Sequence, residues 1–263
     1  MKRVLTVQDL SCVGKCSLTV ALPVLSAMGC SCSVLPTAVL STHTAFPDPH
    51  VRDLTADMRE NIDHWRSVGA EFDGFLVGYL SSPQQAHWVE YLWDRFDGLR
   101  ILDPAMGDGG KLYSGMTAGN IIAMEQLCKK TDVLIPNVTE ACLLCGIPYE
   151  TGRERAWYER LTEILLRKGC KRVVLTGVSL EAGMTGFLTS DGTAYQTQRL
   201  SGHYHGTGDL FAAVLAGGLL GGKDLYAAAK VAAGFVEACI KSTGEYSKFG
   251  IRFEENLGKL TGN

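Results

Sequence analysis

The sequence predicts an α/β fold in which a mostly parallel central sheet is covered by helices on both faces. Strand-like and helix-like segments alternate along the chain. The strand-like segments are short, continuous apolar runs such as Phe75-Leu76-Val77, which are typical of parallel strands buried between two helical layers. The chain has 263 residues, 46% of them hydrophobic, and we find neither a repeat nor a linker in it. We therefore expect a single domain over residues 1–263.

In the first part of the chain, apolar runs predict strands, and apolar residues at near-helical spacing predict helices. The polar stretch Pro36–His50 is typical of a loop. The expected strands are Lys2–Val7, Ser33–Leu35, Gly74–Gly78 and Arg100–Asp103. The expected helices are Ser17–Met28, Arg52–Val68 and Pro83–Phe96.

The second part of the chain continues the alternation and ends in helices. Asp191-Gly192 is a hairpin signal, so Gly186–Thr189 and Ala194–Thr197 are expected to form a small antiparallel hairpin late in the chain. Further strands are expected at Val133–Ile135 and Arg172–Thr176. Helices are expected at Asn120–Lys129, Thr139–Cys145, Trp157–Lys168, Asp209–Leu220 and Asp224–Lys241.

Charge and composition exclude several classes of partner. The net charge of -3 argues against broad binding to nucleic acid or to an anionic membrane. No apolar run approaches the roughly 20 residues that span a bilayer, and Asp9 interrupts the short apolar N-terminal stretch. The nine cysteines are expected to be reduced thiols, and Cys142 and Cys145 lack the second pair that a structural zinc site needs. We expect a cytoplasmic protein.

Polar residues gather at the expected ends of the strands. Asp103 and Thr176 are the last residues of expected strands, and Asp9, Tyr79 and Asn137 come shortly after such strands. In open α/β sheets, ligands bind outside the carboxyl ends of the strands. The strand ends therefore predict a binding site at that edge of the sheet.

The most informative stretch is Gly206-Thr207-Gly208-Asp209, which runs directly into an apolar, helix-compatible segment. Glycines let a phosphate approach the free amides of the first helical turn, where the helix dipole is positive. A carboxylate beside that anion suggests a base that deprotonates a hydroxyl attacking phosphorus. A glycine-rich turn with Asp209 as an ordinary N-cap explains the four residues alone; the longer motif and two upstream motifs favour catalysis.

Two upstream motifs carry acids after strands. Asp103 and Asp108 in Asp103-Pro104-Ala105-Met106-Gly107-Asp108 suit Mg²⁺ held through waters and substrate phosphates, although Asp-Pro and Gly-Asp also build an ordinary turn. In Pro136-Asn137-Val138-Thr139-Glu140, Asn137 and Glu140 match a capping box, which needs no ligand. Alternatively, Glu140 points toward Asp103 and holds Mg²⁺ through water.

Two further segments are weaker signals. Val13-Gly14-Lys15-Cys16 resembles the end of a phosphate-binding Walker loop, but Asp9 stands where its first glycine belongs and Cys16 where Ser or Thr should bind Mg²⁺. We reject that motif. Ser41-Thr42-His43-Thr44 lies in a polar loop, where a lone histidine is more often a packing residue than a catalyst.

Taken together, these motifs resemble the pyridoxal kinase group of the ribokinase-like superfamily. The three motifs ending at Asp108, Glu140 and Ala213 occur in the family's order and at roughly its spacing. The loop containing His43 is similar to the family's substrate-side Ser-Asn-His-Thr loop, and Tyr79 resembles a tyrosine that lies against the pyridine ring. The resemblance extends from Val4 to about Lys241.

The resemblance implies ATP-dependent phosphorylation of the 5′-hydroxymethyl group of pyridoxal, pyridoxine or pyridoxamine in a homodimer. Asp209 would be the base, and the amides of Gly206, Thr207 and Gly208 would hold the transferring phosphoryl group. Asp103 and Glu140 would position Mg²⁺. The implied nucleotide contacts are Tyr113, Asn137, Thr176 and Gly177, and the implied vitamer contacts are Ser11, Thr44 and Tyr79.

Several positions depart from the family's pattern. Gln8-Asp9-Leu10-Ser11 replaces the usual Gln-Ser-His, so either Asp9 or Ser11 takes the place of the ring-binding serine. Asp9 could pair with a ring nitrogen or with the amine of pyridoxamine. Ile135 stands where some relatives have a threonine linked to a monovalent cation, which leaves K⁺ use open, although Asp108 could serve such a site.

Two other functions compete with a B6 vitamer kinase. One is a hydroxymethylpyrimidine kinase or a sugar kinase of the same superfamily, of which the sugar kinase fits less well with His43 and Tyr79. The other is a catalytically silent vitamer-binding protein, which the fold alone does not exclude. The intact Asp209 and its glycines argue against silence. The segments Pro36–His50 and Gly107–Gly119 are candidates for a loop that closes over the substrate.

Overall fold

The computed structural model describes residues 1–244 and 246–261. By its internal packing the chain divides into two compact units. Unit 1 comprises Met1–Gly78, Asp94–Leu99 and Leu200–Asn263, and unit 2 comprises Tyr79–Trp93 and Arg100–Arg199. Each unit is built from strands and helices of its own, and the single domain expected from the sequence stays a prediction.

The sheet of unit 1 is centred on β1 (Arg3–Ser11). β1 runs parallel to β2 (Ser31–Leu40) on one side and to β4 (Gly74–Val77) on the other. β3 (Val51–Asp53) joins β2 in the antiparallel direction. Val7 of β1 lies opposite Leu35 and Val77, and all three side chains are fully buried. Burial from both faces explains why these strands are continuous apolar runs.

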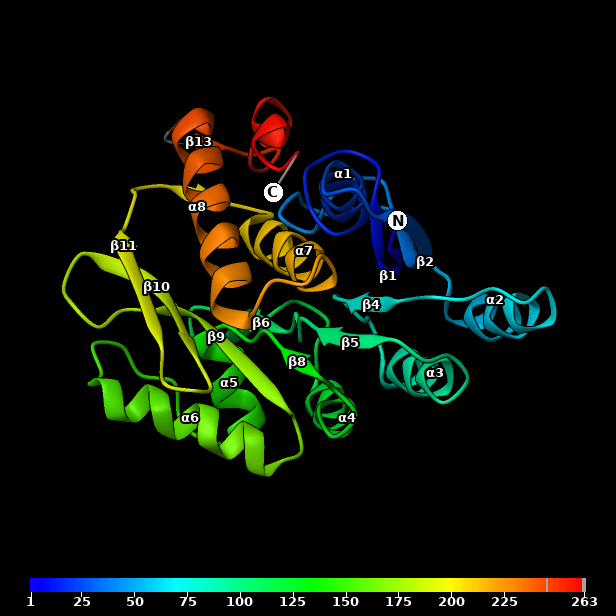
Figure 1. Ribbon diagram of the computed structural model, residues 1–263, viewed down its shortest axis with the longest axis horizontal. Coiled ribbons are helices and arrows are strands. Elements are labelled where there is room, and N and C mark those ends of the chain that lie inside the picture. Colours follow the sequence, from blue (N-terminus) through cyan, green and yellow to red (C-terminus); the bar gives the residue numbers. More distant parts are fainter. Residues whose placement is uncertain (245, 262–263) are drawn as a thin grey trace. The chain divides into compact units, whose positions relative to one another are not determined.

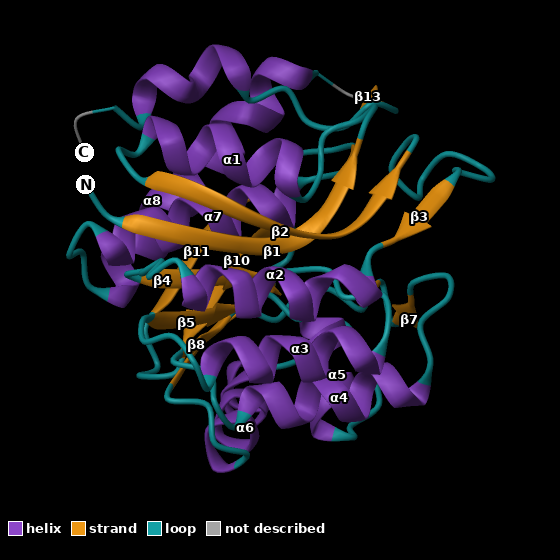
Figure 2. Ribbon diagram, turned by 90° about the vertical axis from the view of Figure 1, so that its right-hand side faces the viewer, coloured by secondary structure: helices purple, strands orange, loops and turns teal. Residues whose placement is uncertain are grey.

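Helices cover both faces of this sheet. β1 and β2 lie side by side between α1 (Leu18–Ala27) and α2 (Thr55–Ser67) (Figure 2). α7 (Thr207–Leu220) packs on α1, on β4 and on α8 (Leu225–Thr243), which lies beside it in Figure 1. Most of α7 is buried. The packing of its apolar residues therefore fixes the position of the first turn of the helix. The unit also contains a short parallel pair, β12 (His203–Tyr204) with β13 (Tyr246–Ser247), and the 3₁₀ helix η1 (Glu254–Lys259).

The strands of unit 2 form a mixed arrangement. β5 (Leu99–Leu102), β8 (Val133–Leu134) and β9 (Arg172–Val178) are parallel. β10 (Met184–Thr189) pairs antiparallel with β9 and with β11 (Ala194–Gln198). The late antiparallel hairpin predicted from Asp191-Gly192 is thereby confirmed. Strands and helices alternate along the chain, and the sheet is mostly parallel, so the predicted α/β fold is confirmed.

Four helices accompany the strands in the described part of unit 2: α3 (Pro83–Trp93), α4 (Ala118–Cys128), α5 (Val138–Cys145) and α6 (Arg155–Arg167). α5 and α6 pack on each other and on β9 (Figure 1). A two-stranded hairpin, β6 (Gly107–Asp108) with β7 (Lys111–Leu112), was not expected. All nine cysteines are free, as expected. No helix within residues 1–244 and 246–261 combines the length and hydropathy that crossing a bilayer requires.

Several expected boundaries were wrong. β1 runs to Ser11 rather than to Val7, because its pairing with β2 resumes after an irregularity between Gln8 and Leu10. Asp9 therefore lies within the strand and not after it. β2 continues through Pro36 to Leu40, so the loop begins later than expected. Arg52 and Asp53 pair with β2, which delays the start of α2 to Thr55.

Two further boundaries bear on the site. β9 ends at Val178, so Thr176, the expected last residue, and Gly177 both lie inside the strand. Pairing with β10 extends this strand past Thr176. α7 begins at Thr207, which places Asp209 in its first turn rather than at its start. Each difference arises where hydrogen bonding continues through polar residues or glycine.

Gly186→Ala should destabilise the protein because β10 and β11 approach closely at this position. A Cβ on Gly186 would lie 1.8 Å from the carbonyl oxygen of Tyr195, which is main chain and cannot move away cheaply. We expect a loss of about 1–3 kcal/mol in the free energy of unfolding, measured by urea denaturation.

The matched control is Gly234→Ala in α8. A Cβ there meets nothing within 4 Å, and alanine is the better helix former. We expect Gly234→Ala to stabilise the protein by about 0.5–1 kcal/mol. A Gly186→Ala variant as stable as the parent protein would contradict the close approach of the two strands.

Candidate active site

The first turn of α7 forms the glycine-rich cradle, residues Gly206–Gly208, that the sequence predicts. Gly206 is the N-cap of the helix, and its φ of 88° lies in the left-handed region that favours glycine. A Cβ on Gly206 would lie 2.3 Å from the carbonyl oxygen of Lys15. The first helical hydrogen bond ends on the Gly206 carbonyl, so the amides of Thr207, Gly208 and Asp209 precede it. These amides and the helix dipole favour an anion.

Asp209 is the third residue of α7, so the interpretation of Asp209 as an N-cap was wrong. Its carboxylate accepts a hydrogen bond from the backbone amide of Ser17. Burial raises the pKa of Asp209 to about 6, and the nearby charge of Asp9 raises it too, while the Ser17 amide opposes both. A carboxyl group with this pKa is mostly ionised at neutral pH and is suited to accept a proton.

Asp9 and Ser11 form one hydrogen-bonded group. The Ser11 hydroxyl donates to Oδ2 of Asp9 at 3.1 Å, and the Ser17 hydroxyl donates to Oδ1 at 2.6 Å. Asp9 is buried, with 5% of its surface exposed, and this burial raises its pKa although both hydroxyls lower it. In unit 1, Ser11 and Ser17 therefore both bond Asp9, and Ser17 also contacts Asp209.

His43 is a packing residue with both ring nitrogens engaged. Nδ1 accepts the Ala45 amide at 3.2 Å, so Nε2 carries the proton and donates to the Lys248 carbonyl at 3.1 Å. Burial lowers the pKa of His43, and His205, 5.1 Å away between ring centroids, lowers it further. The ring joins the loop after β2 to the loop before Ile251, while its neighbour Thr44 is exposed.

In unit 2, Asn137 and Glu140 form the predicted capping box of α5. Asn137 Oδ1 accepts the Glu140 amide at 2.9 Å, and Glu140 Oε2 accepts the Asn137 amide at 2.8 Å. Glu140 also accepts the amides of Met106, at 3.1 Å, and Gly107. Burial nevertheless raises the pKa of Glu140 to about 8, and the charge of Asp108 adds to the rise. The capping interpretation is confirmed, and the metal-binding role of Glu140 stays a prediction.

The remaining predicted residues of unit 2 have different surroundings. Asn137 Nδ2 donates to the Gly107 carbonyl at 2.8 Å, and Asn137 forms a parallel bridge with Thr176. Thr176 and Gly177, whose φ is 74°, lie near the end of β9. Asn137, Glu140, Asp108 and Thr176 are thus gathered around the start of α5.

Three further predicted residues follow strands along the chain. Asp103 follows β5 directly, and Tyr79 comes two residues after β4. Tyr113 follows β7, with 42% of its surface exposed and its amide bonded to the Met106 carbonyl at 2.8 Å. The roles of all three stay predictions.

The residues of unit 2 fit Mg²⁺ only as partners to a bound nucleotide. Among the residues that the structure describes, no three His, Cys, Asp or Glu side chains form a group that could hold a metal ion. Mg²⁺ commonly keeps several waters and binds one or two carboxylates together with substrate phosphates. Asp108, exposed in the β6–β7 hairpin, and Glu140 are close enough for charge to act between them. Two carboxylates fit a Mg²⁺ ion that is also held by water and nucleotide phosphates, and not one held by protein ligands alone.

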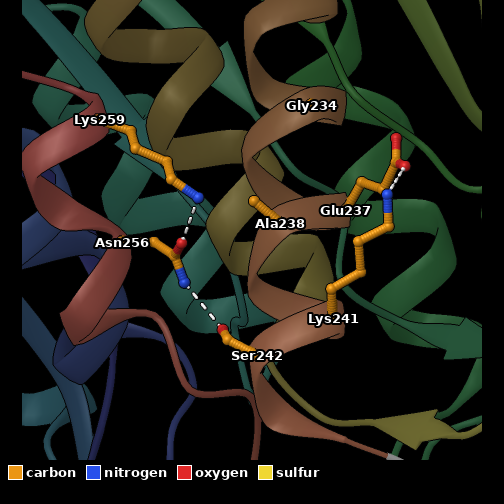
Figure 3. Close-up of a pocket in the computed structure, with 7 residues that line it drawn as sticks. All are labelled: Gly234, Glu237, Ala238, Lys241, Ser242, Asn256 and Lys259. Carbon is orange, nitrogen blue, oxygen red and sulfur yellow. Dashed lines mark hydrogen bonds and ion pairs between the residues drawn. The ribbon is translucent and has the colours of Figure 1, made fainter.

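A groove of about 600 Å³ between α8 and η1 contains none of the predicted site residues (Figure 3). Its two lysines are engaged: Lys241 Nζ lies 2.5 Å from Glu237, and Lys259 Nζ lies 2.7 Å from Asn256. The polar groups of the groove are therefore already engaged in hydrogen bonds or an ion pair.

Sequence reasoning missed Ser17, which contacts the carboxylates of Asp9 and Asp209. The sequence predicts Ser17 as the first residue of a helix, and serine is common at helix starts. No local sequence pattern could have found it, because one of its acidic partners, Asp209, lies far away along the chain. Gly14 was also missed as a packing position, and a Cβ there would lie 2.0 Å from the His43 ring.

Comparison with known proteins identifies similar kinases. Residues 22–251 match the family model described as phosphomethylpyrimidine kinase. The structure of a pyridoxal kinase from Lactobacillus plantarum is 33% identical, with a TM-score of 0.91 over 99% of this chain and 96% of that chain. A putative phosphomethylpyrimidine kinase from Bacteroides thetaiotaomicron, in a crystal form with pyridoxal, is 34% identical, with a TM-score of 0.93 over 98% of this chain and 95% of that chain.

A relative whose name states its substrates is also similar to this chain. The pyridoxine/pyridoxal/pyridoxamine kinase of Bordetella bronchiseptica is 28% identical over 261 residues, covering 92% of this chain and 89% of its own. These likenesses extend over nearly the whole chain, so they include the residues of both units.

Asp209→Asn should raise thermal stability at neutral pH. The pKa of Asp209 is about 6 in the folded protein against 3.8 for a free carboxyl, so the folded state binds this proton more tightly than the unfolded state. Its stabilising contribution is present at low pH and is lost as pH rises from about 3.8 to about 6. We expect a Tm gain of a few degrees at pH 7.5 and a much smaller gain at pH 4.5, measured by calorimetry.

Asp57→Asn is the matched control, because Asp57 is an exposed acid in the first turn of α2. It should leave Tm nearly unchanged at pH 7.5. An Asp209→Asn variant that is less stable than the parent protein at pH 7.5 would show that the Asp209 charge is well compensated.

Proposed function

The chain belongs to the phosphomethylpyrimidine kinase family, in the pyridoxal kinase group of the ribokinase-like superfamily, and we propose that it transfers the γ-phosphoryl group of ATP to the 5′-hydroxymethyl group of a B6 vitamer. Membership of this family makes the protein a phosphotransferase. Pyridoxal, pyridoxine and pyridoxamine are the proposed acceptors. The name of the Bordetella relative and the pyridoxal in the Bacteroides crystal form support this choice.

One observation carries the proposal: a partly buried carboxylate with a raised pKa stands directly behind an anion cradle. Asp209 follows Gly206–Gly208 in the first turn of α7, and its pKa is about 6. In the proposed reaction, Asp209 accepts the proton of the vitamer hydroxyl as the oxygen attacks phosphorus. The amides of Thr207 and Gly208 then hold the charge that develops on the transferring phosphoryl oxygens.

The residues of unit 2 are proposed to hold the nucleotide and its metal. Mg²⁺, when bound with ATP, would neutralise phosphate charge and orient the phosphates. Asp103, Asp108 and Glu140 would hold it mostly through water, because Glu140 is already bonded to three amides. The proposed contacts with ATP itself are Tyr113, Asn137, Thr176 and Gly177. The use of K⁺ stays open.

The vitamer is proposed to bind against residues of β1 and the loops that follow the strands. Asp9 and Ser11 would contact the ring together, because their hydrogen bond makes them a single polar surface. Tyr79 would lie against the ring, and Thr44, which is exposed, would reach it from the loop after β2. His43 would act from behind that loop, because both of its ring nitrogens bind main chain.

Two alternatives remain for the same site. A hydroxymethylpyrimidine kinase has the same mechanism with another flat acceptor, and the name of the matching family model favours it. A silent vitamer-binding protein would keep the fold without turnover. We further propose a homodimer in the cytoplasm, from the resemblance to pyridoxal kinases and from the free thiols.

The first test is an ADP-release assay with ATP and Mg²⁺ on five acceptors in parallel. Pyridoxal, pyridoxine, pyridoxamine, hydroxymethylpyrimidine and ribose are compared at equal concentration. We expect turnover on at least one B6 vitamer. Turnover on the pyrimidine or the sugar alone would keep the role of Asp209 and replace the substrate. Vitamer binding without turnover on any acceptor would favour the silent binding protein.

Asp209→Ala should lower kcat by about 10²–10⁴-fold, because a positioned base contributes about that factor. Affinity for ATP, measured by calorimetric titration, should stay within about twofold, since Asp209 is not among the proposed ATP contacts. Asp57→Ala, in the first turn of α2, is the control and should retain full activity. Unchanged turnover in Asp209→Ala would remove Asp209 as the base.

A further inference from the structure

Ser17 joins the buried carboxylate of Asp9 to the partly buried carboxylate of Asp209 in unit 1. Its hydroxyl donates to Oδ1 of Asp9 at 2.6 Å, and its backbone amide donates to the carboxylate of Asp209. Ser17 is itself buried, with 6% of its surface exposed. Asp9 and Asp209 carry like charges when ionised, and the charge of Asp9 raises the pKa of Asp209. A single residue with two donors therefore holds two like charges in fixed positions.

The main chain at Ser17 is held in an unfavourable conformation. Among residues 1–244 and 246–261, only Ser17 and Asp48 are non-glycine residues with positive φ, and Ser17 has φ 47° and ψ −125°. Such conformations persist only where the surroundings impose them, and they gather at functional sites. This conformation lets the amide face one carboxylate while the side chain reaches the other.

The side chain of Ser17 also gives up its ordinary local role. Ser17 stands at the N-cap of α1, where serine normally accepts a hydrogen bond from the first helical turn. No side-chain cap forms, because the hydroxyl is directed to Asp9. Serine here does not serve the helix that it precedes, so helix capping does not explain its presence.

The turn before α1 is fixed from several sides. Thr19 Oγ1 donates to the Cys16 carbonyl at 2.7 Å, and the Lys15 amide donates to the Phe249 carbonyl at 2.8 Å. The carbonyl oxygen of Lys15 also lies against Gly206 of the cradle. These contacts hold Ser17 in its strained form and tie its position to that of the first turn of α7.

We propose that Ser17 is a positioning residue for phosphoryl transfer, which fixes the orientation of Asp209 through its amide and couples it to Asp9 through its hydroxyl. The inference rests on the proposed function of Asp209 as the base. With one side of the Asp209 carboxylate bonded to the Ser17 amide, rotation of that carboxylate is restricted. A base so held presents its free lone pairs in one direction, which favours a single geometry of attack.

Two variants of Ser17 test the hydroxyl separately from the strain. Ser17→Ala removes the hydroxyl and keeps the strain, whereas Ser17→Gly removes both and retains the amide. With pyridoxal, or the acceptor that turns over best, we expect both to lower kcat about tenfold or more, as loss of a hydrogen bond to a charged group predicts. The KM for ATP should change less than about twofold, since Asp9 and Asp209, the two carboxylates that Ser17 bonds, are not assigned to the nucleotide.

The decisive measurement is a double-mutant cycle with Asp9→Ala, which removes the acceptor of the Ser17 hydroxyl. If the Ser17 hydroxyl acts through Asp9, Ser17→Ala should lower kcat less than about twofold further in the Asp9→Ala background. Ser26→Ala, on the exposed side of α1, is the matched control and should keep the parent kcat. Thermal unfolding checks folding, and Ser17→Gly, which relieves the strain, keeps the test valid if Ser17→Ala is unstable.

The outcomes separate this inference from the proposed function. Ser17 variants with the parent kcat, or with a raised vitamer KM alone, would overturn the positioning role while Asp209→Ala remained inactive. Equal losses from Ser17→Ala in both backgrounds would also overturn it, because they show no coupling to Asp9. Full activity of Asp209→Ala would instead overturn the proposed function itself.

Discussion

The burial of α7 is the constraint on which the site depends. The apolar run that begins at Leu210 packs against α1, α8 and β4, so the helix has little freedom to shift. Its first turn is therefore fixed, and the left-handed Gly206 brings the chain into that turn close to Lys15. A rigid helix start places the free amides and Asp209 in a partly buried position, and the same burial raises the pKa of that acid.

A fixed anion cradle and buried acids make opposite demands on the surrounding chain. Amides that attract phosphate favour negative charge, whereas two carboxylates in one buried region repel each other. Unit 1 reconciles these demands with hydroxyl and amide donors rather than with a lysine or arginine, since Lys15 pairs with Glu254. Neutral donors hold Asp9 and Asp209 in place without cancelling the charge that a base needs.

The sequence predicts the alternation of strands and helices, the late hairpin and the cradle, because these depend on local periodicity and glycine. It does not predict that β1 continues through Asp9, because pairing with β2 resumes beyond an irregularity that no local pattern announces. The capping box of Asn137 and Glu140 is predictable from four consecutive residues. The role of Ser17 is not, because its partner Asp209 lies far away along the chain.

Glu140 and Asp209 show how the same helical position can serve structure or chemistry. Each is the third residue of its helix, after Asn137 in α5 and after Gly206 in α7. Glu140 accepts three amides and completes a cap with the Asn137 side chain. Glycine has no side chain with which to form such a cap, and Asp209 accepts the amide of Ser17 instead. The Asp209 carboxylate therefore keeps lone pairs that no cap occupies, and the proposed reaction requires such lone pairs to face the substrate hydroxyl.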